Sequence, residues 1–222
     1  MASGAGGGRS ASHTAVLALL LGLFAAVIGV SGSDLVEVAR LFKTRQDLEA
    51  VRTMVLVYHA RHGALPGADP RGFAAVPPGV RGLAGNGRWD GPPVDLASPQ
   101  PTEAVAAWLD LARAGLWQAE PQAAYVPFLP LPRNRFGGAM LFADRVLGLG
   151  PSLCLTGVPA AAAVRLDHRL DDGDTVTGRL RAAVVEGDST GGLRALGPGL
   201  TPSPPPEQSQ RAMAVCLEVD PR

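Results

Sequence analysis

The first part of the chain carries two apolar patterns in direct succession. Residues 15–30 read AVLALLLGLFAAVIGV, and no charged residue lies between Arg9 and Asp34. Such a run is typical of a membrane-spanning helix or of a secretory signal peptide. Together with its uncharged neighbours, the segment reaches the ~20 residues that a bilayer requires, so its length permits both interpretations.

In the second pattern, apolar side chains recur at the steps of one helix face. They are Leu35, Val38, Phe42, Leu48, Val51, Val55 and Tyr58, with charged residues between them. No proline interrupts this stretch, so we predict one continuous helix over residues 14–62. Gly63 stands where a left-handed cap ends a helix, and Pro66 and Gly67 follow, so these three residues form the predicted helix exit.

The remainder, residues 63–222, alternates short periodic segments with stretches rich in glycine and proline. Residues 64–101 and 187–210 have little periodicity and are predicted to be loops. The predicted elements are a helix over residues 102–115, a hairpin over 138–150 turning at Asp144 and Arg145, a second short helix over 159–170, and strands over 178–185 and 212–219. The predicted fold class is α+β, with a small antiparallel sheet packed on the distal half of the long helix.

Composition narrows the classes of function. The 222 residues suit one ordinary domain with an appendage. The 20 basic and 20 acidic residues cancel, and the basic residues are scattered, so no nucleic-acid partner is expected. The 28 glycines and 20 prolines indicate a head with many loops.

The chain has two cysteines, Cys154 and Cys216, each inside an apolar run. Two cysteines alone do not complete a four-ligand zinc site. Composition by itself slightly favours two buried, reduced thiols, since free cysteine is among the most buried residues. An export signal reverses that preference and favours a disulfide.

Five segments in order along the chain resemble prepilin-type proteins, the family of type II secretion pseudopilins and type IV pilins. They are the helix and its exit (residues 32–70), Gly85-Asn86-Gly87, the tryptophan helix AVAAWLDLARAGL, the loop and strand LDHRLDDGDTVTGRL, and the closing strand MAVCLEV. The resemblance covers most of residues 14–219. It implies a pilin-like fold and a structural role.

The resemblance also implies an organisation. Residues 1–13 are a short leader or cytoplasmic tail, residues 14–62 the long helix with a membrane span at about 14–33, and residues 63–222 a periplasmic head. The chain is then a single-pass protein of the bacterial inner membrane, with its head in the periplasm, or outside the cell once assembled. Its helix contacts other pilin-like subunits, and a Cys154–Cys216 disulfide closes the head.

The processing region departs from the family pattern of a glycine, a phenylalanine and a glutamate at mature position five. If Gly8 is the cleavage glycine, position five is His13. If the helix fixes the alignment, Arg9 replaces the glycine and position five is Thr14. Neither residue supplies the carboxylate, so we predict a minor or tip-type subunit. The alternative is a single-span, membrane-anchored periplasmic binding module that does not polymerise.

No catalytic residue is predicted, and the chain is not expected to be an enzyme or to take a small-molecule substrate. Residues 187–191 match the G-x-S-x-G nucleophile elbow around Ser189, but that elbow requires a later histidine, and all four histidines precede Ser189. His59 and His62 lack further ligands and are predicted to lie on the polar face near the helix end.

Asp171, Asp172 and Asp174 crowd carboxylates onto one turn, which is the ligand chemistry of a calcium site. The spacing and distal glutamate of an EF-hand are absent, so a polar turn whose aspartates bond their own backbone is the competing interpretation. Asn86 and Asp90 are predicted to form a plain turn. No cofactor is expected other than this calcium ion.

Overall fold

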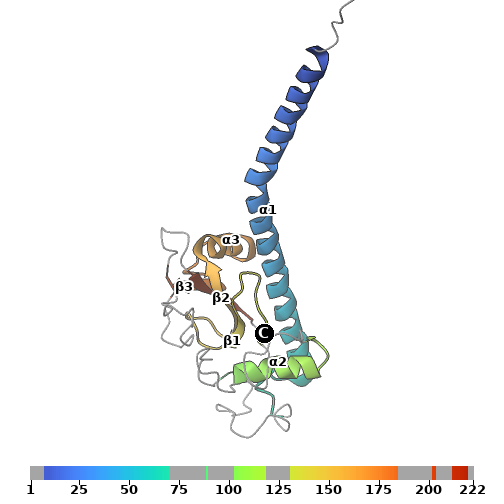
Figure 1. Cartoon of the computed structure of the whole chain (residues 1–222). Coiled ribbons are helices and arrows are strands. Elements are labelled where there is room, and N and C mark those ends of the chain that lie inside the picture. The colour runs from blue at the N-terminus through green and yellow to red at the C-terminus, as the bar shows by residue number, and fades with distance from the viewer. Residues whose placement is uncertain are drawn as a thin grey trace, which may run out of the picture. The chain divides into compact units, whose positions relative to one another are not determined.

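The structure is a computed structural model of the whole chain that describes residues 8–70, 89, 103–118, 131–184, 202–203 and 212–219. Within its helices, the side chains of residues 8–14, 21–34 and 104–105 also lie outside the description. The chain divides into two compact units, Met1–Phe42 and Lys43–Arg222. Within the described residues, seven elements are assigned (Figure 1): α1 Gly8–His62, α2 Glu103–Arg113, β1 Met140–Ala143, β2 Ser152–Pro159, α3 Ala160–Leu170, β3 Leu180–Val184 and β4 Ala212–Glu218.

Helix α1 confirms the predicted continuous helix and its end. It begins earlier than predicted, at Gly8, and no break interrupts its 55 residues. After His62, Gly63 adopts a φ of 70°, and its N–H donates to the carbonyl oxygen of His59 at 2.7 Å. A left-handed residue at this position is most easily a glycine, which is why the sequence marked the end so clearly.

The part of α1 in the larger unit buries one face. The buried residues alternate steps of four and three: Thr44, Leu48, Val51, Val55 and Tyr58. This spacing keeps one stripe of the helix turned toward the head. The distal part of the predicted apolar stripe is therefore core, and the head packs on it as expected.

The head contains a four-stranded antiparallel sheet in the order β1-β2-β4-β3. Helix α3 contacts β2, β3 and β4, and α2 contacts β1. The predicted second short helix and the two late strands are confirmed within a residue or two as α3, β3 and β4. The α+β class, with a long helix on a small antiparallel sheet, is thus confirmed.

The predicted hairpin over residues 138–150 is wrong in its second half. Strand β1 does end before Asp144, but its partner is β2, which starts only at Ser152. Strand β2 is central and is buried over its first five residues on both faces. A strand covered on both sides loses the alternation that identifies a strand in a sequence, which explains why the pattern did not predict it.

Among the described residues, no helix is long and apolar enough to cross a membrane. The structure thus does not support the span predicted at about residues 14–33.

Candidate functional site

The smaller unit presents an apolar surface on α1. Eight of its large apolar side chains are 47% to 68% exposed: Val16, Leu17, Leu19, Leu20, Leu35, Val36, Val38 and Phe42. We call these eight residues the open apolar stretch. A helix with apolar side chains on several faces is ordinarily covered by other helices or by lipid. The stretch is therefore the candidate surface for assembly.

The helix exit holds α2 against the end of α1. Gly67 has a φ of 80°, and a Cβ atom there would lie 2.2 Å from the carbonyl oxygen of Glu103 and 2.6 Å from the amide nitrogen of Ala107. The Gly67 N–H donates to Asp110 Oδ2 at 2.7 Å. Only glycine permits both this conformation and this approach, so Gly67 has a structural role.

Pro66, which lies between Gly63 and Gly67 in the exit, also contacts the head. Its carbonyl oxygen accepts a hydrogen bond of 2.6 Å from Nε1 of Trp89. The Trp89 ring in turn lies 5.0 Å from that of Phe142 on β1. The predicted exit residues thus join the long helix to the core of the head.

Two buried carboxylates and a tyrosine lie behind the exit. Asp69 and Asp110 are 1% and 4% exposed, and the Tyr58 hydroxyl donates to Asp69 Oδ2 at 3.3 Å. Burial raises the pKa of Tyr58, and the charges of Asp110 and Asp69 add to that rise. Burial also raises the pKa of Asp110, although the Gly67 amide counteracts it. These groups form hydrogen bonds with one another and with the backbone, so their role is to stabilise the helix exit.

His62 belongs to the same region. Its ring lies 4.3 Å from that of Tyr58, and Nδ1 lies 3.8 Å from Asp69 Oδ2. The helix end thus brings His62 to a buried acid, a partner that the sequence did not predict.

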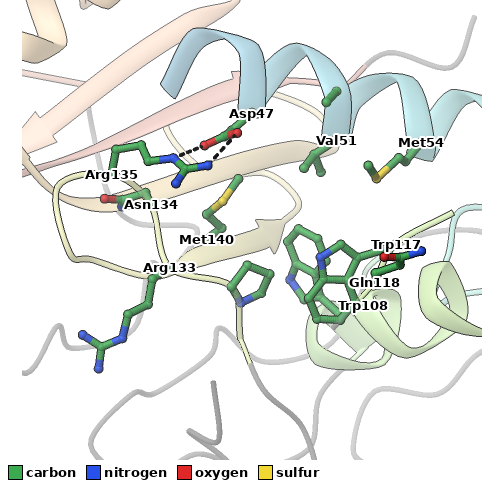
Figure 2. A pocket seen from close by; sticks show the side chains of 12 residues that line it. Asp47, Val51, Met54, Trp108, Trp117, Gln118, Arg133, Asn134, Arg135 and Met140 are labelled. Atoms are coloured by element: carbon green, nitrogen blue, oxygen red, sulfur yellow. Dashed lines mark hydrogen bonds and ion pairs between the residues drawn. The ribbon is translucent and has the colours of Figure 1, made fainter. Parts of the chain in front are cut away.

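A pocket of about 620 Å³ lies between α1 and the head, within the larger unit. Figure 2 shows the indoles of Trp108 and Trp117 at one end, and Asp47 with Arg135 at the other. Arg135 donates to Asp47 from Nε at 2.7 Å and from Nη2 at 3.3 Å. The volume falls within the range of small-molecule sites.

Trp108 stands at the centre of an aromatic cluster beside this pocket. Its ring centroid lies 5.1 Å from that of Trp117 and 4.6 Å from that of Phe142. It is fully buried, and among the described residues its Nε1 has no hydrogen-bond partner. The cluster fixes the apolar face of α2 in the core, as the predicted tryptophan helix requires.

The predicted disulfide is present. Cys154 on β2 lies directly opposite Cys216 on β4, with a Cα–Cα distance of 4.0 Å and a sequence separation of 62. Both cysteines are fully buried. The bond therefore crosses the two central strands.

The aspartate turn follows α3, and the structure changes its membership. The carboxylates that converge are those of Asp167, Asp171 and Asp172, with one oxygen of each within 4.8 Å of the others. Asp174 is not in this group, and its Oδ1 accepts the Val176 amide at 3.0 Å. The sequence offered a signal for Asp167, since it follows Leu166 on the buried face of α3.

The carboxyl groups of this turn lie in different environments, one buried and one exposed. Burial raises the pKa of Asp167 to about 6, opposed by the Gly173 amide and reinforced by the charges of Asp172, Asp171 and Asp174. Hydrogen bonds from the Asp174 amide and the Thr177 hydroxyl lower the pKa of Asp172. One carboxylate is therefore costly to ionise, while its exposed neighbour ionises readily.

Several predicted residues lie outside the described part of the chain. Ser189, Asn86 and Asp90 fall there, as do the side chains of Arg9 and Thr14. Gly8 is described only as the first residue of α1. The predictions made for these positions stay predictions.

The chain was compared with protein families, curated proteins and solved structures. No protein-family model and no curated protein matches the chain. Among solved structures, the chain is similar to the major type IV pilin PilA1 of Clostridium difficile, at 13% identity and a TM-score of 0.37, over 84% of this chain and 98% of that one.

Proposed function

We propose that this chain is a pilin-like structural subunit that contacts other pilin-like subunits through the N-terminal part of α1. The observation that carries the proposal is the open apolar stretch, whose members are about half to two thirds exposed. Exposed apolar area of this extent on a helix costs free energy in water until a partner covers it. The ordered motifs of the sequence agree with such a role.

The proposal includes a location. Residues 15–30 are apolar throughout, which favours anchoring in a bacterial inner membrane with the head in the periplasm. The buried disulfide supports an oxidising compartment for the head, because disulfides persist there and are rare in the cytosol. Alkaline extraction of membranes, followed by protease protection of the head, tests this location.

We further propose a minor or tip position in a secretion or type IV pilus-like assembly. His13 or Thr14 stands at mature position five, so the chain offers no carboxylate to a neighbour's N-terminal amine. An unpaired charge inside an apolar helix bundle is costly, and a subunit at the tip has no such neighbour above it. Its recovery as the dominant protein of sheared filaments would contradict this placement.

Cysteine cross-linking in intact cells tests the assembly itself. Leu35→Cys places a thiol in the open apolar stretch, and Arg40→Cys is a matched control at an exposed, charged position of the same helix. We expect covalent adducts with pilin-like chains from Leu35→Cys and none from Arg40→Cys.

A second candidate function is a membrane-anchored binding module that does not polymerise. The pocket beside Trp108 and Trp117 favours it, because its volume suits a small ligand. In the cross-linking experiment this alternative predicts a membrane-bound monomer for both cysteine variants. That outcome would replace the first proposal.

A further inference from the structure

The pocket between α1 and the head has two chemically different ends. Asp47 and Arg135 form an ion pair at one end, and the indoles of Trp108 and Trp117 lie at the other. In Figure 2, the apolar side chain of Met140 lies between the two ends. Polar groups in a mostly apolar pocket fix the orientation of a ligand. A ligand that fits this pocket therefore has a charged end and an apolar body.

One face of α1 forms a wall of the pocket. Asp47, Val51 and Met54 follow one another at steps of four and three residues, so their side chains share a face of the helix. The charged group stands at the beginning of this face, and apolar groups continue it. Methionine side chains are flexible, so Met54 and Met140 can adjust to the shape of an apolar ligand.

A hydrogen-bonded turn presents Arg135 to the pocket. The Asn134 N–H donates to the carbonyl oxygen of Gly138 at 2.8 Å, and Asn134 Oδ1 accepts the Phe136 amide at 2.8 Å. Asn134 Nδ2 donates to the carbonyl oxygen of Thr156 on β2 at 2.7 Å, which fastens the turn to the sheet. The backbone beside Arg135 is thus fixed before a ligand binds, which lowers the cost of binding.

The aromatic end is fixed by the turn that ends α2. Gly115 has a φ of 69°, and the N–H groups of Leu116 and Trp117 donate to the carbonyl oxygen of Leu111 at 2.9 and 3.2 Å. The Trp117 ring lies 5.1 Å from that of Trp108. Trp108 is fully buried, whereas Trp117 is only partly buried. Trp117 therefore presents the ring surface that a ligand can contact.

The ion pair offers a negative and a positive group side by side. Arg135 Nε lies 2.7 Å from Asp47 Oδ2, and both side chains are partly exposed, so a solute can reach them. An α-amino acid carries its ammonium and its carboxylate on the same carbon atom, so its two charges are also adjacent. The ammonium suits a carboxylate, and the carboxylate suits a guanidinium. The charges at the two ends of a peptide are further apart.

We propose that this pocket binds a free α-amino acid with an aromatic side chain. Its ammonium contacts Asp47, its carboxylate contacts Arg135, and its side chain extends along Met140 toward Trp117. This inference rests on the second candidate function and names its class of ligand. For a ligand of about a dozen heavy atoms with partly exposed charges, we expect a dissociation constant of about 1 mM.

Saturation-transfer NMR of the full chain in detergent, titrated with L-phenylalanine, tests the ligand class after subtraction of a detergent blank. Phenylpropionate lacks the ammonium, and phenylethylamine lacks the carboxylate. Each should bind about fivefold more weakly than phenylalanine, because solvent screens each contact in part. N-acetyl-L-phenylalanine amide lacks both charges and should bind most weakly. If this amide bound as tightly as phenylalanine, apolar contact alone would explain binding, and the proposal would be overturned.

Two variants of α1 test the assignment to residues. Asp47→Asn removes the partner of the ammonium and should weaken phenylalanine binding about fivefold. Glu49→Gln is the matched control, because Glu49 pairs with Arg45 at 2.9 Å with similar exposure, and neither residue lines the pocket. It should bind phenylalanine like the parent chain. Equal losses in both variants, or no binding by the parent chain at about 10 mM phenylalanine, would overturn the proposal.

Failure of this inference is distinguishable from failure of the proposed functions. The titration uses the isolated chain, whereas the cross-linking of Leu35→Cys uses intact cells and does not involve the pocket. Cross-linked adducts without phenylalanine binding would support assembly and overturn the amino-acid site. Phenylalanine binding by a chain that gives no adducts would support both the site and the second candidate function.

Discussion

The apolar stripe of α1 has two parts with the same sequence pattern and opposite surroundings. Leu48 and Val55 in the larger unit are 0% exposed, whereas Leu35 and Phe42 in the smaller unit are 68% and 49% exposed. The head supplies the partner for the distal part. The eight residues of the open apolar stretch are about half to two thirds exposed among the described residues, so the proposed cover is another molecule or lipid.

Helical periodicity thus identifies a face that needs burial without identifying what buries it. Residues at three- and four-residue steps share a face in both parts of the helix. In the larger unit, burial of this face stabilises the folded head. In the smaller unit, the exposed face is available for association. The two parts should therefore respond differently to the same substitution.

The largest difference is expected on removal of the disulfide. Replacing Cys154 and Cys216 together by alanine should lower the free energy of unfolding of the head by about 4 kcal/mol, because the bond closes a loop of 62 residues. Fluorescence of the three tryptophans, Trp89, Trp108 and Trp117, reports the head during denaturant unfolding, and far-ultraviolet circular dichroism reports the helices. If the variant lost its helical signal entirely in the transition that the tryptophans report, residues 8–42 would unfold together with the head. That result would contradict the separation of the two parts of α1.

A matched pair of leucines compares the two parts directly. Leu48→Ala removes a fully buried side chain and should lower the free energy of unfolding by about 3 kcal/mol. Leu35→Ala removes an exposed one and should change it by less than about 0.5 kcal/mol.

Assembly should show the reverse order for these two variants. Leu35→Ala should weaken cross-linking or co-purification with pilin-like partners, measured with folded protein. Leu48→Ala should retain that association in the fraction that still folds. If Leu35→Ala and Leu48→Ala lowered the free energy of unfolding equally, the open apolar stretch would be packed in the isolated chain as well.

The helix exit depends on a buried acid of the head, Asp110. Asp110→Ala leaves the buried Gly67 N–H without its acceptor and should cost about 1 to 3 kcal/mol. Asp110→Asn keeps an acceptor oxygen and should cost less. Denaturant unfolding of both variants measures the difference.

The same residue should make the stability of the head depend on pH. Burial raises the pKa of Asp110, so the folded state holds its proton more tightly than the unfolded state does. Its stabilising contribution is present below the ordinary pKa of about 4 and is lost as the pH rises through the raised value. Relative to Asp110→Asn, the parent chain should lose stability as the pH rises from about 4. A constant difference between the two would contradict this assignment.

The smallest effect is expected at the pocket rim. Asp47→Asn breaks the ion pair with Arg135. The side chain of Asp47 is 30% exposed and that of Arg135 is 51% exposed. Solvent screens such a pair, so the free energy of unfolding should fall by less than about 1 kcal/mol. Titration with salt provides the check, because the parent chain and the variant should converge at high ionic strength.

The residues that the sequence predicted well are those whose signals are local. Gly63 ended the helix because a left-handed cap favours glycine, and the order of apolar steps identified Leu48, Val51 and Val55 as one face. Strand β2 was missed because it is buried on both faces, and the hairpin was therefore assigned to the wrong partner. The late strands kept enough apolar character to be found.

The amino-acid order was enough to predict the long proline-free helix, its exit at Gly63, an α+β head and the residues that can form a disulfide. Those features depend on neighbours in the chain, on backbone preferences and on periodicity. Packing of the folded chain was needed to show which part of the apolar stripe is core and that Cys154 faces Cys216. It was also needed to show that Asp167 replaces Asp174 beside Asp171 and Asp172. Each of these depends on how distant segments approach one another, because burial and carboxylate convergence are properties of packing rather than of residue order.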